Sequence, residues 1–366
     1  MMRQSIASAP PDRELALLAR QVLAGTRLDA GPLLALAHAG RQRPWELLHW
    51  AHSVRSLRFG RAVRLCAIVP GKLGACTEDC SWCGQSAVCD GGAETPAVTG
   101  TDGIVAAARA AGRWGAGCFG IINSGRRPSR RDLAAVAHAV TAINQTPNPP
   151  AGESDSSDPT GRSAHRAPHL CASLGELTEA QAAELAAAGI TRYNHNLETS
   201  RRFFPRVVTT HSYDDRLATL AAAKRAGLEL CRGGIFGMGE TWEDRVELAL
   251  TLRDRVGPRI VPLNFLHPIP GTPLGQVQPL TPMEILTIVA VFRLGMPETD
   301  LMIAGGRENL RSLQSWIFHA GATSCISGDY LTYQGRPAAS DLQMLADLGM
   351  QVVDELPVKA GAVAKG

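Results

Sequence analysis

Three cysteines lie close together in one short segment of this chain. Cys76, Cys80 and Cys83 fall within GACTEDCSWCGQS (74–86) at the spacing C-x3-C-x2-C. Thiolates at such spacing can bind zinc or an iron–sulfur cluster. A structural zinc site usually has four ligands from paired C-x2-C turns, and Cys89 would have to be the fourth. Ligand chemistry favours a 4Fe–4S cluster held by three thiolates, with one iron open to a further ligand, and zinc stays the alternative.

The composition of the whole chain limits the roles open to these thiols. Its 366 residues are 45% hydrophobic and 19% charged, as in ordinary globular proteins, and the net charge is +3. No dense block of Lys or Arg supports binding to nucleic acid or to a membrane surface. The start of the chain lacks the apolar run of a signal peptide, so we expect a cytoplasmic protein. Nine cysteines in that reducing compartment indicate metal binding, catalysis or core packing rather than disulfides.

A repeating order of elements begins at about residue 62. Short apolar or β-branched runs alternate with polar, Gly- or Pro-containing loops and with Ala- and Leu-rich helical patterns. The expected strands cover 62–69, 118–123, 169–174, 191–196, 228–236, 259–266, 300–305 and 322–327. Strand–helix units in this number predict a (β/α)8 TIM-type barrel, and a doubly wound open sheet is the competing fold.

Helical patterns fill the intervals between the strands and follow the last one. Two of them are TWEDRVELALTLRD (241–254) and ENLRSLQSWIFHAG (308–321). Thr178 and Thr281 stand directly before helical patterns, and each carries the hydroxyl that suits an N-cap.

The domain organisation follows from the same patterns. We expect a helical N-terminal extension over 1–44, the barrel over 45–350 and a C-terminal tail over 351–366. The segment 145–167 is rich in Pro, Ser, Asp and Gly, and we interpret it as a flexible surface insertion, with a functional lid as the less favoured alternative.

The cysteine cluster follows the first expected strand, at the C-terminal face where such barrels carry their chemistry. C-x3-C-x-aromatic-C in this place resembles the signature of radical S-adenosylmethionine enzymes. The resemblance implies that Cys76, Cys80 and Cys83 hold a 4Fe–4S cluster whose open iron binds S-adenosyl-L-methionine. Reduction of such a cluster cleaves the cofactor and yields a 5′-deoxyadenosyl radical, which removes a hydrogen atom from the substrate.

Five further segments are similar, in the same order, to segments of biotin synthases. They are YNHNLETS (193–200), CRGGIFGMGE (231–240), VPLNFLHPIPGTPL (261–274), AGGRENLRSLQ (304–314) and GDYLT (328–332). Several motifs in one order are more specific than any one alone. The resemblance implies conversion of dethiobiotin to biotin, with sulfur taken from an auxiliary iron–sulfur cluster. The alternative is another radical S-adenosylmethionine enzyme on the same barrel, which would mature a hydrogenase cofactor or rearrange an amino acid.

The resemblance also implies roles for single residues around the cofactor and the substrate. S-adenosyl-L-methionine would be bound by Asn194, Glu198, Gly233, Gly237, Gly239 and Glu240. Glycines allow a backbone to approach a ligand closely, although packing at a strand-to-helix turn would explain them equally well. The ureido ring of dethiobiotin would be bound by Asn196 and Asn264, and the alternative for each is a satisfied core amide. Radical chemistry is carried by the cofactors, so no side chain is assigned as catalytic.

The auxiliary cluster would be held by cysteines inside the expected strands. Cys118, Cys171 and Cys231 match the family's ligands, and Met302 aligns with the arginine that many biotin synthases use as the fourth ligand of a 2Fe–2S cluster. Cys66, on the first strand, could converge with these three. Four thiolates would suit a four-iron cluster better than a two-iron one, and core packing is the alternative for Cys66.

The partners follow from the resemblance alone. We expect dethiobiotin as the substrate, a reducing flavoprotein or ferredoxin as the electron donor, and a homodimer. We expect neither a nucleic acid nor a membrane as a partner.

Overall fold

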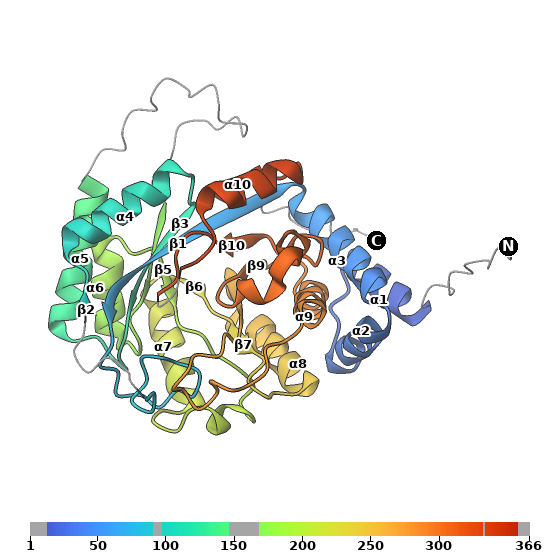
Figure 1. Cartoon of the computed structure of the whole chain (residues 1–366), viewed down its shortest axis with the longest axis horizontal. Helices are drawn as coiled ribbons and strands as arrows, with labels where there is room; N and C mark the ends of the chain where they lie inside the picture. The colour runs from blue at the N-terminus through green and yellow to red at the C-terminus, as the bar shows by residue number, and fades with distance from the viewer. Residues whose placement is uncertain (1–12, 91–96, 146–167, 332–333, 358–366) are drawn as a thin grey trace, which may run out of the picture.

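Parallel strands form a closed ring at the centre of the computed structural model, which describes residues 13–90, 97–145, 168–331 and 334–357. The ring consists of β1 (Ala62–Leu73), β3 (Cys118–Asn123), β4 (His169–Ser173), β5 (Arg192–Asn194), β6 (Glu229–Cys231) with its continuation β7 (Gly234–Phe236), β8 (Ile260–Phe265), β9 (Asp300–Ile303) and β10 (Ser324–Ile326). Each strand pairs in parallel with its neighbours, and β10 pairs with β1 (Figure 1). The predicted barrel is therefore confirmed, because an open sheet would leave β1 and β10 unpaired.

The pairing register decides which side chains meet inside the barrel. Cys66 of β1 lies opposite Cys118 of β3, and Cys231 of β6 lies opposite Asn194 of β5. Alternate residues of a strand face the same side, so these four positions can share one layer of the interior. Two short strands lie outside the ring and pair with β1: β2 (Ala97–Val98) and β11 (Gln351–Val352).

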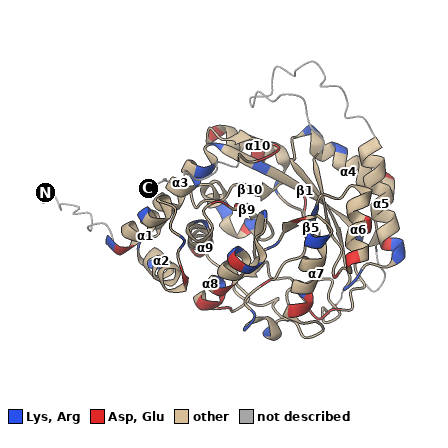
Figure 2. Ribbon diagram, turned by 180° about the vertical axis from the view of Figure 1, so that it is seen from behind, with Lys and Arg blue, Asp and Glu red and all other residues tan. Residues whose placement is uncertain are grey.

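Helices surround the ring, and acidic and basic residues are interspersed along them (Figure 2). They are α4 (Thr101–Arg113), α5 (Arg130–Gln145), α6 (Glu179–Ala188), α7 (Tyr213–Arg225), α8 (Trp242–Leu250), α9 (Pro282–Gly295) and α10 (Ala338–Asp347). The predicted caps are confirmed: Thr178 forms a capping box with Gln181, and Thr281 forms one with Glu284. No helix in the described ranges is long and apolar enough to cross a membrane.

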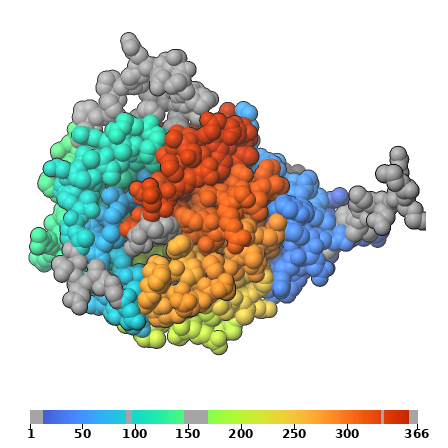
Figure 3. Space-filling view, viewed as in Figure 1, coloured from blue at the N-terminus to red at the C-terminus, as the bar shows by residue number. Residues whose placement is uncertain are grey.

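Three helices precede the barrel: α1 (Arg13–Leu23), α2 (Ala30–Gln42) and α3 (Pro44–Phe59). They lie outside the ring beside α9 and cover one flank of the molecule (blue in Figure 3). α9 is predominantly apolar, and every residue from Ile285 to Gly295 is buried, Arg293 included. A helix of that composition must be covered on both faces, and the N-terminal helices cover the face that turns away from the barrel.

One predicted helix is wrong. The segment 308–321 lies mostly in η3 (Arg307–Ile317), a run of short 3-10 turns that is broken at Arg311, where φ is 53°. Tertiary contacts at the start of the segment account for the difference. Arg307 forms a buried ion pair with Asp341 at 2.6 Å, and the Asn309 side chain donates to the carbonyl of Leu266 at 2.9 Å. Such contacts override the helical periodicity of the sequence.

Two further elements differ in detail from the prediction. The expected strand 228–236 is interrupted at Gly233, where an added Cβ would lie 1.8 Å from the carbonyl oxygen of Pro262. The expected helix 241–254 ends as an α-helix at Leu250, and a π-helical stretch, η2 (Thr251–Val256), follows.

Other expectations fall wholly or partly outside the described residues. Apart from Gln145, the last residue of α5, the expected insertion 145–167 lies outside them, and so does the end of the tail from residue 358.

Candidate functional site

The end of β1 leads into a loop that carries the clustered cysteines, and this loop (74–86) is called the cysteine loop below. It opens at Gly74 and Ala75, which both have positive φ, 80° and 47°. The amide of Gly74 donates to Oε1 of Gln85 at 2.8 Å, and its carbonyl accepts from the hydroxyl of Ser124 at 2.7 Å. These bonds close the base of the loop and tie it to the end of β3.

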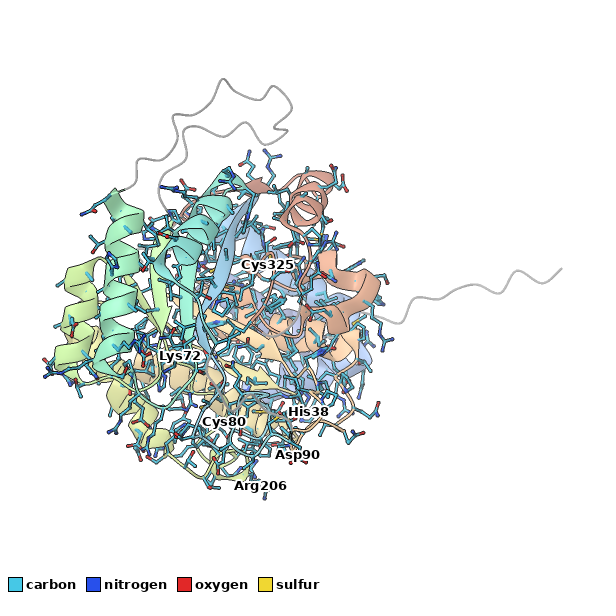
Figure 4. All side chains as sticks on the ribbon, turned by 60° about the vertical axis from the view of Figure 1, so that its left-hand side comes forward. His38, Lys72, Cys80, Asp90, Arg206 and Cys325 are labelled. Atoms are coloured by element: carbon cyan, nitrogen blue, oxygen red, sulfur yellow. The ribbon has the colours of Figure 1, made fainter. Side chains whose placement is uncertain are left out.

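The segment after β5 holds the middle of the cysteine loop. The carboxylate of Asp79 accepts from the amides of Thr209 and Thr210 at 3.0 and 3.2 Å. Partial burial raises the pKa of Asp79, but these hydrogen bonds outweigh it and hold the pKa at about 2. The amide of Ser81 donates to the carbonyl of Val207 at 3.0 Å. Figure 4 shows Cys80 among the loops at this end of the molecule, well separated from Cys325.

The cysteine loop forms one wall of a cavity of about 260 Å³ at the C-terminal ends of the strands. Six of the residues predicted from the sequence line this cavity: Cys76, Cys80, Cys83, Asn194, Asn196 and Glu198. Burial raises the pKa of the Cys80 thiol, and it raises that of Cys83 to about 11. Thiolates here therefore require a strongly positive partner, as a bound metal cluster would be.

Glu198 has an unusual backbone and an incompletely bonded carboxylate. Its φ of 68° turns the chain at the edge of the cavity. Oε1 accepts from Nη1 of Arg216 at 3.2 Å, whereas Oε2 is buried and has no hydrogen-bond partner. Burial raises the pKa of Glu198, and the charge of Arg216 and the side chain of Asn196 oppose the shift. A buried carboxylate oxygen without a donor fits a ligand that brings hydroxyl groups.

A chain of polar contacts behind Glu198 was not predicted. Nε of Arg216 donates to Nε2 of His211 at 3.1 Å, so Nδ1 of His211 carries the proton that bonds Glu78 at 2.5 Å. Glu78 belongs to the cysteine loop, and Arg216 belongs to α7. The signal in the sequence was weak, because only Glu78 lies next to a recognisable motif.

A second group of cysteines lies inside the barrel, and it is called the cysteine row below. The row consists of Cys66, Cys118, Cys171 and Cys231, all of them buried and without disulfides. The thiols make contact in that order from one strand to the next. The structure thus brings Cys66 together with the three predicted ligands, and Met302 packs in the same cluster.

The thiols of the row do not form a ready site for one metal ion. Among the described residues, no three His, Cys, Asp or Glu side chains are arranged to hold a single metal ion as they stand. Asn194 connects the row to the cavity, because it lines the cavity while its amide donates to the sulfur of Cys231 at 3.4 Å.

Glu240, which is predicted to bind the cofactor, has a carboxylate that is bonded within its own loop and by α8, and its role toward the cofactor stays a prediction. Its carboxylate accepts from the amides of Gly237 and Met238 at 2.9 and 2.8 Å and from Nε of Arg245 at 2.8 Å. Gly237 and Gly239 have φ of 96° and 106°, so the loop itself requires glycine. None of these residues lines the cavity beside the cysteine loop.

Two other residues predicted to bind ligands, Gly233 and Asn264, contact the backbone of neighbouring segments. Gly233 does not line the cavity either, and its close approach to β8 explains it as a packing position. The side chain of Asn264 donates to the carbonyl of Gly234 at 3.1 Å and accepts from the amide of Gly305 at 2.9 Å. Asn264 therefore behaves largely as a hydrogen-bonded core amide. One N–H of its side chain and one lone pair of its oxygen remain available to a ligand.

Comparison with known families divides the chain into two matched parts. Residues 73–252 match the Radical SAM superfamily, and residues 262–351 match the Biotin and Thiamin Synthesis associated domain. The biotin synthase of Trichlorobacter lovleyi is 42% identical over 94% of this chain and 98% of its own length. That of Heliobacterium modesticaldum is 44% identical over 90% of this chain and 96% of its own length.

Solved structures with a similar fold are more distant in sequence. Methylornithine synthase superposes with a TM-score of 0.72 at 19% identity and covers 92% of this chain and 97% of its own. The FeFe-hydrogenase maturase HydG of Carboxydothermus hydrogenoformans superposes with a TM-score of 0.74 at 17% identity and covers 93% of this chain and 79% of its own. These two similarities support the barrel fold.

Proposed function

The chain belongs to the biotin synthase family of radical S-adenosylmethionine enzymes, and we propose how its residues serve the conversion of dethiobiotin to biotin. The proposal places two iron–sulfur clusters at two depths of one barrel. The cysteine loop would hold one cluster at the open cavity, and the cysteine row would hold the other inside the barrel. The observation that carries this assignment is the contact of four buried cysteines from strand to strand inside the barrel, with Asn194 linking them to the cavity.

Cys76, Cys80 and Cys83 would bind the 4Fe–4S cluster, and the wall opposite them would bind S-adenosyl-L-methionine. The bound cluster and cofactor together supply the radical that removes hydrogen atoms from the substrate. Glu198 presents its free, buried Oε2 toward a ligand with hydroxyl groups, which fits the ribose of the cofactor. Arg216 holds the other carboxylate oxygen in place, so Glu198 would be oriented before the cofactor binds.

The cysteine row would hold a four-iron auxiliary cluster that supplies the sulfur. Four thiolates can bind such a cluster without help from another residue type. Met302 shares the layer, but a thioether carries no charge and is a weaker ligand than a thiolate. The burial of the row supports this role, because a cluster that gives up sulfide must be protected from water and from stray thiols.

Dethiobiotin would bind between the two clusters. Asn196 lines the cavity, its Oδ1 accepts from the amide of Gly233 at 3.0 Å, and its side chain also interacts with Glu198. Its remaining N–H and lone pair would bind the ureido ring. Asn264 would contribute its remaining N–H from β8. A flavoprotein or ferredoxin as the reductant and a homodimeric assembly belong to the proposal through family membership alone.

Iron counting tests the four-thiolate site. In a variant with Cys76, Cys80 and Cys83 all replaced by alanine, only the auxiliary cluster can form. We expect about four irons per chain after anaerobic reconstitution, and we expect them to be lost on the further change Cys66→Ala. Cys325→Ala is the matched control, because Cys325 is buried in a different part of the core and should not matter. About two irons, unaffected by Cys66→Ala, would contradict a four-thiolate cluster.

A product assay separates the proposal from the alternative enzyme of the same fold. The reconstituted protein is incubated with S-adenosyl-L-methionine, a reductant and dethiobiotin, and biotin is measured by mass spectrometry. Biotin in an amount that follows the auxiliary iron content is the expected result. Cleavage of the cofactor that is independent of dethiobiotin, without biotin, would favour the alternative.

A further inference from the structure

Two arginines lie inside the barrel on the N-terminal side of the cysteine row, and together they are called the floor arginines. Arg64 precedes Cys66 by two residues in β1, so both side chains face the interior. Arg192 of β5 pairs in register with Cys171 of β4. Arg64 is 3% exposed and Arg192 is 1% exposed. A fully buried guanidinium is expensive unless its charge and its N–H groups are matched.

The protein supplies hydrogen-bond acceptors for only some of the N–H groups of the two arginines. Nη2 of Arg64 pairs with Asp300 at 2.6 Å, and Nε of Arg192 donates to Glu229 at 2.6 Å. Nε of Arg64 and Nη1 of Arg192 have no hydrogen-bond partner, and both atoms are closed off from solvent. A cavity of about 250 Å³ opens below the floor arginines, but these two enclosed atoms do not reach it. Each therefore needs an acceptor from within the barrel.

The carboxylates of Asp300 and Glu229 are already paired with other nitrogens of these arginines, and the sulfur atoms of the row are the further acceptors that the structure places near them. Arg64 interacts electrostatically with Cys66, Cys118 and Cys231, and Arg192 interacts with Cys118. The other buried side chains of the same cluster are apolar: Ile260, Met302, Ala304 and Ile326. Tyr330 packs against the cluster, but its hydroxyl donates to the carbonyl of Ala304 at 2.9 Å. Above the row, Asn194 donates to Cys231. Arg232, which follows Cys231 in the chain, interacts electrostatically with Cys231 alone, whereas Arg64 interacts with three thiols of the row.

We propose that Arg64 and Arg192 donate hydrogen bonds to the sulfur atoms of the auxiliary cluster and raise its reduction potential. This inference rests on the proposed function, because it requires a cluster in the cysteine row. Four thiolates give the cluster a high negative charge, and reduction increases that charge. Positive groups and N–H donors beside the sulfur atoms stabilise the reduced form more than the oxidised form. In this chain the floor arginines supply the positive charge that the thioether of Met302 does not supply.

Redox titration of the auxiliary cluster tests the inference. The parent is the variant lacking Cys76, Cys80 and Cys83, and the cluster is titrated with dithionite and followed by electron paramagnetic resonance. Arg64→Gln and Arg192→Gln should each lower the equilibrium constant for one-electron reduction at least about tenfold, which is about 59 mV more negative. Arg58→Gln is the matched control, because Arg58 lies at the same end of the barrel but pairs outside it with Glu298 at 3.6 Å.

A second measurement leaves the floor unchanged and does not depend on the folding of those variants. The same parent is produced with 15N-labelled arginine, and pulsed electron paramagnetic resonance of the reduced cluster should detect a weak 15N coupling. Absence of that coupling, or potentials in both glutamine variants equal to that of the parent, would overturn the inference. A parent that binds no iron at all would instead overturn the proposed function.

Discussion

At the scale of single residues, the seven proposed cluster ligands differ in exposure. The three cysteines of the cysteine loop are half-buried at an open cavity, whereas all four of the row are buried. The difference fits the two proposed tasks. A cluster that binds a cofactor must be reachable from solvent, and a cluster that is consumed as a sulfur source must be shielded.

Loss of one thiolate from the cysteine loop should abolish cofactor cleavage. We expect that Cys76→Ala, Cys80→Ala or Cys83→Ala yields a folded protein that forms no 5′-deoxyadenosine from S-adenosyl-L-methionine, because the cluster needs all three ligands. The measurement is product quantification by chromatography, with circular dichroism to check the fold. Cys89→Ala is the control, since the Cys89 thiol donates to the carbonyl of Asp90 and does not line the cavity. Normal 5′-deoxyadenosine formation in any of the three variants would refute the assignment.

The two asparagines should differ in what their removal changes. Asn196→Ala should weaken dethiobiotin binding by about 1–3 kcal/mol, because polar groups of the ligand lose their partner. Asn264→Ala should weaken binding and also lower the melting temperature, since this side chain connects the backbones of Gly234 and Gly305. Calorimetric titration and thermal unfolding measure the two effects. Unchanged binding in both variants would point away from dethiobiotin as the ligand.

The cysteines could be recognised from the sequence because the spacing of thiols indicates metal chemistry by itself. The partners of a polar residue cannot be recognised in this way. Glu240 is bonded within its own loop and by Arg245 one turn of α8 further on. The floor arginines depend on the strand register, which aligns Arg192 with Cys171, and a shift of one residue would turn Arg192 out of the barrel.

At the scale of elements, the cysteine loop is held by contacts far away in the chain. Asp79 binds the turn at Thr209 and Thr210, and the carbonyl of Ser81 accepts from the amide of Leu274 at 3.1 Å. The loop therefore rests on the segments that follow β5 and β8. These segments must be in place before three thiols can face one cluster.

Removal of the Asp79 carboxylate should reduce loading of the loop cluster without unfolding the barrel. Asp79→Ala leaves the amides of Thr209 and Thr210 without their acceptor, so the cysteine loop becomes more mobile. We expect a several-fold slower reconstitution, followed by visible absorbance. Asp102→Ala, a change in the first turn of α4, should reconstitute at the original rate. An equal rate in the Asp79 and Asp102 variants would show that the docking contact is dispensable.

Periodicity predicted most elements correctly and failed where backbone or tertiary contacts intervene. The eight barrel strands were placed by their apolar runs. The interruption at Gly233 arises from the approach of Pro262 on a neighbouring strand, and the break at Arg311 follows contacts anchored at Arg307 and Asn309. Both causes lie in residues distant along the chain, so a local pattern could not indicate them.

At the scale of the whole molecule, the N-terminal helices complete the core of the barrel. α2 and α9 run antiparallel, because Leu33 lies by Gly295 and Gly40 lies by Thr287. An added Cβ at Gly40 would come within 3.2 Å of Thr287, so the two helices meet closely there. The sequence predicted a helical extension, but it gave no sign that the extension covers α9, because an apolar helix can be buried by any neighbour.

If this contact stabilises the barrel, a truncated side chain in α2 should lower the stability of the whole barrel. Leu33→Ala removes a fully buried side chain at the contact with α9, and it should lower the free energy of unfolding by about 2–5 kcal/mol. Urea unfolding followed by circular dichroism measures the loss, which should appear as one shift of the whole transition. Leu17→Ala in α1, where the side chain is 57% exposed, is the matched control and should change little. A separate early transition with an unshifted main one would mean that the extension folds independently of the barrel.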